Sequence, residues 1–312
     1  VLSRRQRQMC IRDSHHSDHD GGDCLGGDHN STTPNSHGST VMRVNRTLIL
    51  LLGIWSLAPL IWQVYTSFCT DQALVTPFAE HAQRWTLAHY QSVLHSDPPF
   101  LKYLFNSLFA GVLSTLLTLI LALPASYSLS KLNKQTANLI RGLLVGCALF
   151  PYVLLFLALL EVARFLQLGN SLIALAIPYA ALSQPLAVLL LTNAFADLPT
   201  ELEDAARVEG LSLLQRFRWV LLPLIAPAIA STSILVFLFS WNEYPIALTW
   251  ISDASKLTLP VAMARIAGSS IHSVPYGPYA AATVLGSIPL ILLVMAFQKP
   301  IVSGLTSGAV KG

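Results

Sequence analysis

Charge is scarce in this chain. Only 11% of its 312 residues are Asp, Glu, Lys or Arg, whereas 53% are hydrophobic. Soluble domains carry about 25% charged residues. The composition therefore excludes an ordinary soluble fold and predicts a membrane protein. The formal net charge of +3 is small and gives no reason to expect a nucleic-acid partner.

Several chemistry-bearing patterns are also missing. The four cysteines, Cys10, Cys24, Cys69 and Cys147, show no paired spacing that would predict a disulfide framework. None of the lysines follows a glycine, so the chain lacks the GxxxxGK phosphate loop and a separate ATPase would have to supply any ATP-derived energy. Every histidine lies outside the long apolar runs, so an intramembrane hydrolase would lack its base.

The first 41 residues differ in composition from the rest. They contain residue types that bind metals, namely His15, His16, His19, Asp20, Cys24 and His29. No spacing matches a closed metal site, so we predict no metal. With few apolar residues, 1–41 is expected to be a disordered or artefactual tail. Met42 precedes Arg43, Arg46 and an apolar run, so we expect the natural start there and a membrane domain over 42–312.

Six apolar runs are long enough to cross a bilayer as helices, which takes about 20 residues each. They cover 48–67, 104–128, 143–163, 171–195, 224–249 and 279–297. The runs lack the alternating polar residues of a membrane β-barrel. The sequence therefore predicts an all-α membrane protein with six transmembrane helices.

Lys and Arg fall unevenly between these runs. If the N-terminus is cytoplasmic, 10 of them lie in the inner segments and 5 in the outer segments near the spans. Cytoplasmic loops carry the excess of positive charge. We therefore expect both termini, and the segment 199–223, on the cytoplasmic side.

The segment 199–223 is a polar island between two apolar runs. Thr200 with Glu203, and Ser212 with Gln215, have the spacing of capping boxes. Two helix starts within about a dozen residues predict a pair of short helices that project from the membrane.

Gly210 lies between these predicted helices, where it can adopt the left-handed conformation that ends a helix. The small Ala205 and Ala206 would let another protein approach the backbone closely. Two interpretations remain open from these local features, namely a docking surface and a solvated loop.

The spacing of this island carries a family resemblance. Its key positions are Asp204, Ala205, Ala206, Gly210 after three residues, and Val220, Leu222 and Pro223 after nine more. This pattern resembles the EAA motif of ATP-binding-cassette (ABC) importer permeases, with Asp204 where the family usually has Glu. WTLAHYQSVL at 85–94, SWNEY at 240–244 and GLTSGAVKG at 304–312 resemble the smaller permease of maltose-type carbohydrate importers.

The resemblance implies a type I ABC importer permease fold in a bacterial inner membrane. It also implies three kinds of partner: a cytosolic ATPase dimer, a second permease that makes a heterodimer, and an extracytoplasmic solute-binding protein. The EAA loop would then provide cytoplasmic coupling helices that seat in the ATPase. Its contact residues would be Glu203, Asp204, Ala205, Ala206, Gly210, Leu222 and Pro223. Whether Glu203 or Asp204 pairs with the ATPase stays open.

A second polar group lies near the outer end of the fifth apolar run. Glu243 is an ionisable residue at such a depth, which suggests a substrate path or a helix partner. Trp241 and Tyr244 could stack on a sugar ring or anchor the helix at the membrane surface. Asn242 and Asn106 complete the candidate path, although interhelical hydrogen bonding is an alternative for Asn106.

Other transporter classes account for less of the sequence. An ABC permease for a polyamine or a phosphate-like anion would share the EAA loop. A secondary transporter would be expected to show inverted repeats or buried charge relays, which this chain lacks. The favoured hypothesis is a sugar or oligosaccharide importer permease that works by alternating access and is not itself an enzyme.

Overall fold

The computed structural model describes residues 36–75, 85–268 and 275–307. The chain divides into two compact units, with the boundary between Trp55 and Ser56. Helix α2 (Ser36–Phe68) runs through this boundary, and its stretch Arg46–Phe68 is apolar enough to span a membrane. Residues 36–41 already belong to α2, whereas the rest of the tail predicted to be disordered lies outside the described residues.

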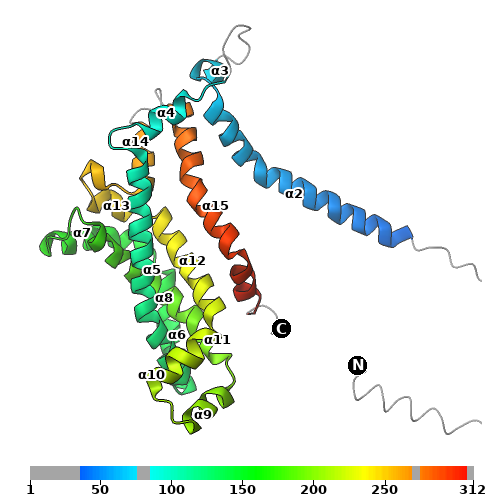
Figure 1. The fold of residues 1–312 in the computed structure, drawn as a ribbon, viewed down its shortest axis with the longest axis vertical. Helices are drawn as coiled ribbons and strands as arrows, with labels where there is room; N and C mark the ends of the chain where they lie inside the picture. Colours follow the sequence, from blue (N-terminus) through cyan, green and yellow to red (C-terminus); the bar gives the residue numbers. More distant parts are fainter. Residues whose placement is uncertain (1–35, 76–84, 269–274, 308–312) are drawn as a thin grey trace, which may run out of the picture. The chain divides into compact units, whose positions relative to one another are not determined.

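The second unit is built on three helices that lie side by side (Figure 1): α5 (Phe100–Lys131), α8 (Leu172–Ala196) and α12 (Ala226–Asn242). A fourth long helix, α15 (Tyr276–Ser307), packs on α12. Small residues line the contacts, because close helix approach in a membrane requires them. Ala122 and Ala187, for example, are fully buried.

Two predicted spans are bent. Helices α6 (Lys134–Leu149) and α7 (Phe156–Phe165) meet at 79°, with Pro151 and the short 3-10 helix η1 (Tyr152–Leu155) between them. The predicted run 224–249 is divided into α12 and α13 (Pro245–Trp250). The second strongly bent helix pair lies at the other end of this run, where Leu213–Leu224 meets α12. Among the described residues, four helices are long and apolar enough to cross a membrane, and there are up to six spans if each of the two bent pairs counts as one.

Short elements gather at the two ends of the helices (Figure 1). One end carries α4 (Ala88–Leu94), α13 and α14 (Leu259–Ile266), with α3 (Asp71–Val75) and the 3-10 helix η3 (Ala254–Lys256) in the adjoining loops. There, Ser67 and Tyr90 share a hydrogen bond of 2.7 Å between their hydroxyl oxygens, which ties the end of α2 to α4.

The opposite end carries the polar island as four consecutive elements. They are α9 (Thr200–Val208), α10 (Leu213–Gln215), the π-helical segment η2 (Arg216–Leu221) and α11 (Leu222–Leu224). The stretch Leu213–Leu224 meets α12 at 77°. The chain therefore turns into the fifth span at Ile225, two residues after Pro223, and Pro227 lies in the first turn of α12.

Packing of α5 against α12 predicts a sensitive glycine. A Cβ atom at Gly111 would lie 2.9 Å from the Phe237 ring, whereas one at Gly142 on α6 would meet nothing within 4 Å. Gly111→Val should therefore lower the free energy of unfolding by about 1–3 kcal/mol. Gly142→Val, with the same change of helix propensity, is the control. Thermal unfolding of the two purified variants in detergent would contradict this packing if their midpoints were equal.

Candidate functional site

The turn after α9 has the geometry of a Schellman motif. Gly210 has a φ of 81°. Its N–H donates to the Arg207 carbonyl at 3.0 Å, and the Leu211 N–H donates to the Ala206 carbonyl at 3.1 Å. A side chain at this φ is strained, which is why glycine ends the helix here. The left-handed turn predicted at Gly210 is confirmed.

The two predicted capping boxes have different outcomes. The box at Ser212 is confirmed, since its hydroxyl accepts from the Gln215 N–H and the Gln215 side chain accepts from the Ser212 N–H. The box at Thr200 is wrong. Pro199 takes the cap position, Thr200 is already helical, and no side chain caps this helix end. Glu203 is instead drawn away from the helix end by partners elsewhere.

Glu203 is the anchor of the loop. The residue is only 7% exposed, and its side chain contacts three residues from two other elements. Tyr127 on α5 donates a hydrogen bond of 2.6 Å, and the Lys131 ammonium at the end of α5 lies 2.5 Å from the carboxylate. The Arg216 guanidinium lies at 3.3 Å. These contacts fasten α9 and η2 to the end of α5.

The charges around Glu203 decide its ionisation. Burial by itself raises the pKa of the carboxyl, but hydrogen bonds from Lys131 and Tyr127 and the charges of Lys131 and Arg216 outweigh it. The pKa is therefore below its usual value of 4.5, and Glu203 is ionised at neutral pH.

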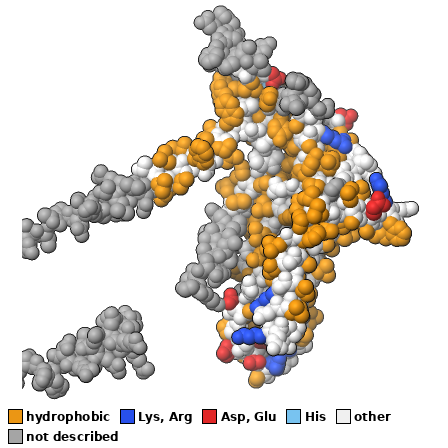
Figure 2. Space-filling model, turned by 180° about the vertical axis from the view of Figure 1, so that it is seen from behind, with side chains coloured by type: hydrophobic (Ala, Val, Ile, Leu, Met, Phe, Trp, Pro, Cys, Tyr) orange, Lys and Arg blue, Asp and Glu red, His pale blue; other side chains and the backbone are white. Residues whose placement is uncertain are grey.

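The neighbouring residues of α9 present a different face. Asp204 and Ala205 are exposed, whereas Ala206 is buried with Glu203. Large apolar side chains are exposed beyond the turn, with Leu214 at 73% and Trp219 at 68%. Figure 2 shows charged side chains grouped at this end of the molecule. Large exposed apolar side chains with polar residues around them mark sites of contact with another protein or with the membrane.

The remaining loop residues lie at the bend into the fifth span. Leu222 is half-buried and packs against the cluster of Phe195, Leu221 and Ile225, while Pro223 is exposed. These two residues therefore belong to the junction with α12. In sequence they are well separated from the exposed face of α9.

Glu243 is buried at the other end of α12, where that helix breaks. It is 2% exposed and accepts hydrogen bonds from the Ile246 N–H at 2.8 Å, the Ala247 N–H at 3.1 Å and the Tyr179 hydroxyl at 2.9 Å. It thus caps α13 and ties it to α8. The carboxylate points into the protein.

Asn106 also serves the packing of this end. Its side-chain nitrogen donates to the carbonyls of Ser255 at 3.1 Å and Leu257 at 2.9 Å, and the residue is 4% exposed. Asn106 therefore joins α5 to the 3-10 helix η3 and the loop before α14, and these hydrogen bonds do not join it to another long helix.

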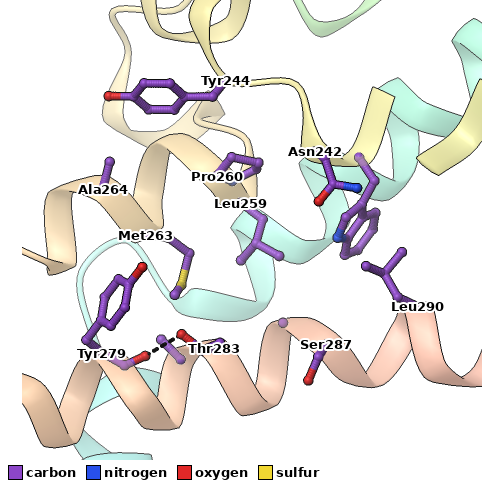
Figure 3. A pocket seen from close by; sticks show the side chains of 13 residues that line it. Asn242, Tyr244, Leu259, Pro260, Met263, Ala264, Tyr279, Thr283, Ser287 and Leu290 are labelled. Carbon is purple, nitrogen blue, oxygen red and sulfur yellow. Dashed lines mark hydrogen bonds between the residues drawn. The ribbon is translucent and has the colours of Figure 1, made fainter. Parts of the chain in front are cut away.

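Trp241, Asn242 and Tyr244 instead line a common cavity of about 490 Å³ between α12, α14 and α15 (Figure 3). Met263 on α14 and Tyr279 and Thr283 on α15 also line it, among other residues of these two helices. Sequence reasoning missed these last three residues. They lie at least 19 positions beyond Tyr244 and carry no local pattern, so only the fold brings them to the cavity.

Comparison with known proteins decides the family. Residues 103–306 match the model of the family described as binding-protein-dependent transport system inner membrane component. The chain belongs to this family of transport permeases. It is accordingly a multi-pass membrane protein and the permease component of an ABC importer, and the permeases of this family are transporters rather than enzymes.

Individual proteins similar to this permease are named as permeases of sugar transport systems. It is 36% identical to the sulfoquinovosyl glycerol transport system permease protein SmoH of Agrobacterium fabrum, over 88% of this chain and 95% of that protein. It is 37% identical to the trehalose/maltose transport system permease protein MalG of Thermococcus litoralis, over 84% and 94%. These similarities extend well beyond the EAA loop.

Solved structures show the same fold. A chain of a bacterial ABC transporter involved in the import of the acidic polysaccharide alginate superimposes with a TM-score of 0.72. The superposition covers 86% of this permease and 99% of that chain at 22% identity. A chain of the MetNI methionine ABC transporter superimposes with a TM-score of 0.53. The permease therefore has the ABC importer fold that the EAA spacing implied.

The anchor at Glu203 makes a prediction for the loop of this permease. Glu203→Ala should raise amide hydrogen exchange in α9 on the order of tenfold, because losing hydrogen bonds to a charged group costs about 1–3 kcal/mol and Lys131 is partly screened by solvent. Glu201→Ala, at an exposed acid of the same first turn, is the control. Equal exchange in both variants would contradict the anchor.

The lowered pKa of Glu203 predicts a pH dependence. Because the folded pKa lies below the usual value of 4.5, the contribution of Glu203 to stability is fully present above about pH 4.5 and is lost as the pH falls through the folded pKa. The melting temperatures of the wild type and Glu203→Gln should therefore converge in acid. A constant difference from pH 7 to acid would refute this.

Proposed function

We propose that this permease imports a sugar or oligosaccharide as one of two permease subunits of an ABC importer. The observation that carries the proposal is the similarity to permeases named for sugar transport, at 36% and 37% identity over 84–88% of the chain. A third such relative is the trehalose transport system permease protein SugB of Mycobacterium tuberculosis, at 36% identity. The shared framework makes transport of a related solute the simplest inference.

The exposed face of α9 is the proposed ATPase contact. Asp204 is free to pair with a basic residue of the ATPase, because its side chain is exposed, whereas the carboxylate of Glu203 is already engaged by Lys131, Tyr127 and Arg216. Ala205 offers little bulk beside Asp204 and permits close seating. Gly210 then sets the direction of the following helix, and the exposed Leu214 and Trp219 extend the contact surface.

The contacts of Glu203 would transmit a movement of the ATPase to the membrane helices. A force on α9 is passed to the end of α5 through Glu203, and to α12 through η2 and the bend at Leu222 and Pro223. Closure of two ATPase subunits could thereby move the helices that pack around α5. In this proposal, α9 and both chain termini are cytoplasmic, and ATP is bound by the ATPase subunits.

The remaining partners follow from the family. A solute-binding protein on the outer side would deliver the sugar, and a second, different permease would complete the path. A chain of the alginate transporter in complex with a pentasaccharide-bound periplasmic protein has the same fold, with a TM-score of 0.55. Within this permease, Trp241, Asn242 and Tyr244 are proposed to face the substrate, while Glu243 and Asn106 hold the backbone around them.

Reversal of charge on α9 tests the proposed function. In proteoliposomes with both permeases, the ATPase and the binding protein, Asp204→Lys should reduce ATP-driven uptake of radiolabelled sugar by at least about tenfold, since like charges replace an attractive pair. Co-purification of the ATPase should fall in parallel. Glu201→Lys, a charge reversal on the same helix, is the control.

Each outcome of this test is informative. Unchanged uptake and co-purification in Asp204→Lys would refute the assignment of Asp204. Absence of ATP-driven uptake for every sugar tested with the wild-type complex, when its ATPase is active, would refute the sugar importer itself.

A further inference from the structure

The cavity beside the break in α12 combines elements from distant parts of the chain. Trp241, Asn242 and Tyr244 come from the end of α12 and the turn after it, Met263 from α14, and Tyr279 and Thr283 from α15. Figure 3 shows Tyr279 and Met263 extending toward one another across the cavity. Its volume of about 490 Å³ falls within the ~300–1,000 Å³ of small-molecule sites.

The side chains around the cavity match the two kinds of surface on a sugar ring. A pyranose has faces of C–H groups and an edge of hydroxyls. Aromatic rings provide large, rigid apolar surfaces, and tyrosine adds a polar hydroxyl at its tip. Tyr244 and Tyr279 supply such rings. The Asn242 amide nitrogen and the Thr283 hydroxyl donate to the carbonyls of Leu238 and Tyr279, so the oxygens of both side chains remain as hydrogen-bond acceptors for sugar hydroxyls.

Charge is what this wall lacks. Among the described residues that line the cavity, none is Asp, Glu, Lys or Arg. The nearest carboxylate in sequence, Glu243, accepts hydrogen bonds from two backbone N–H groups and the Tyr179 hydroxyl. A carboxylate, sulfonate or ammonium group in such a site would have no opposite charge to offset its loss of hydration.

We propose that this cavity is a binding site for one ring of a neutral saccharide, with Tyr279 and Tyr244 as its aromatic contacts. The inference rests on the proposed sugar importer and narrows its substrate to uncharged sugars at this site. Glu243 acts as a positioning residue. By capping α13, it fixes the turn on which Asn242 and Tyr244 stand, one residue to either side.

Site-directed labelling tests occupancy of the cavity in the assembled importer. Thr283→Cys is introduced into a variant in which Cys10, Cys24 and Cys147 are replaced by serine. The new cysteine is then labelled with a small polar thiol reagent. We expect labelling, and protection by a neutral disaccharide such as trehalose or maltose but not by a disaccharide of uronic acids. Tyr276→Cys, exposed on the same helix and outside the cavity wall, should be labelled without protection.

Three results would overturn the proposal. Lack of labelling in the assembled importer would mean that the partner permease covers the cavity. Labelling without protection by any sugar would mean that no saccharide binds there. Equal protection by neutral and uronic acid disaccharides would refute the charge selection.

Uptake measurements provide the functional readout. Tyr279→Ala should reduce sugar uptake roughly tenfold at low sugar concentration, as expected from losing an aromatic contact, with less effect at saturation. ATP hydrolysis stimulated by the binding protein should persist, because α9 is untouched. Tyr276→Ala is the control. Unchanged uptake in Tyr279→Ala would overturn the site while leaving the importer intact, whereas a wild type that imports no sugar would refute the proposed function.

Discussion

Lipid offers no hydrogen bonds to a peptide group, so a membrane helix can stop or bend only where the protein supplies the partners. This chain interrupts its fifth apolar run at both ends, and a buried carboxylate serves each interruption. Glu243 receives the N–H groups of Ile246 and Ala247 where α12 gives way to α13. Glu203 fastens the elements that precede the 77° bend into α12. The proposed substrate site and ATPase contact both depend on these fixed breaks.

The two carboxylates are stabilised differently because their surroundings differ. Glu203 lies beside two cations at a polar end of the bundle, where Lys131 still reaches solvent at 46% side-chain exposure. Glu243 relies on backbone N–H groups and the hydroxyl of Tyr179, which is itself fully buried. An ion pair joins the ends of long side chains. Two N–H groups at the start of one helix, by contrast, fix the direction of that helix relative to the carboxylate. The break at Glu243 is accordingly suited to holding side chains around a cavity, and the contacts of Glu203 are suited to joining three helical elements.

Local rules predicted the parts of this architecture that depend on neighbouring residues. The spacing around Gly210 and Ser212 contains its own hydrogen-bond partners, so the turn and the second helix start could be derived from sequence. The box at Thr200 failed because Pro199 took the cap position and Glu203 had stronger partners 72 or more residues away, on α5. The same limit applied to the cavity: nothing near Tyr279 in sequence indicates that it lines one cavity with Met263 and Tyr244. The division of 224–249 could not be predicted either, because the backbone N–H groups that Glu243 accepts from become available only where the helix breaks.

Helical phase separates the roles of the two adjacent acids on α9. Successive residues of a helix differ by about 100° around its axis, and residues three apart lie on nearly the same face. Glu203 and Ala206 are therefore buried together against α5 and η2, while Asp204 and Ala205 face outward. In the EAA spacing, the acidic position is the one occupied by Asp204. Asp204 stays exposed while Glu203, one residue earlier, is held by Lys131, Tyr127 and Arg216, so the two adjacent carboxylates have separate surroundings, and only Asp204 is placed for the proposed contact with the ATPase.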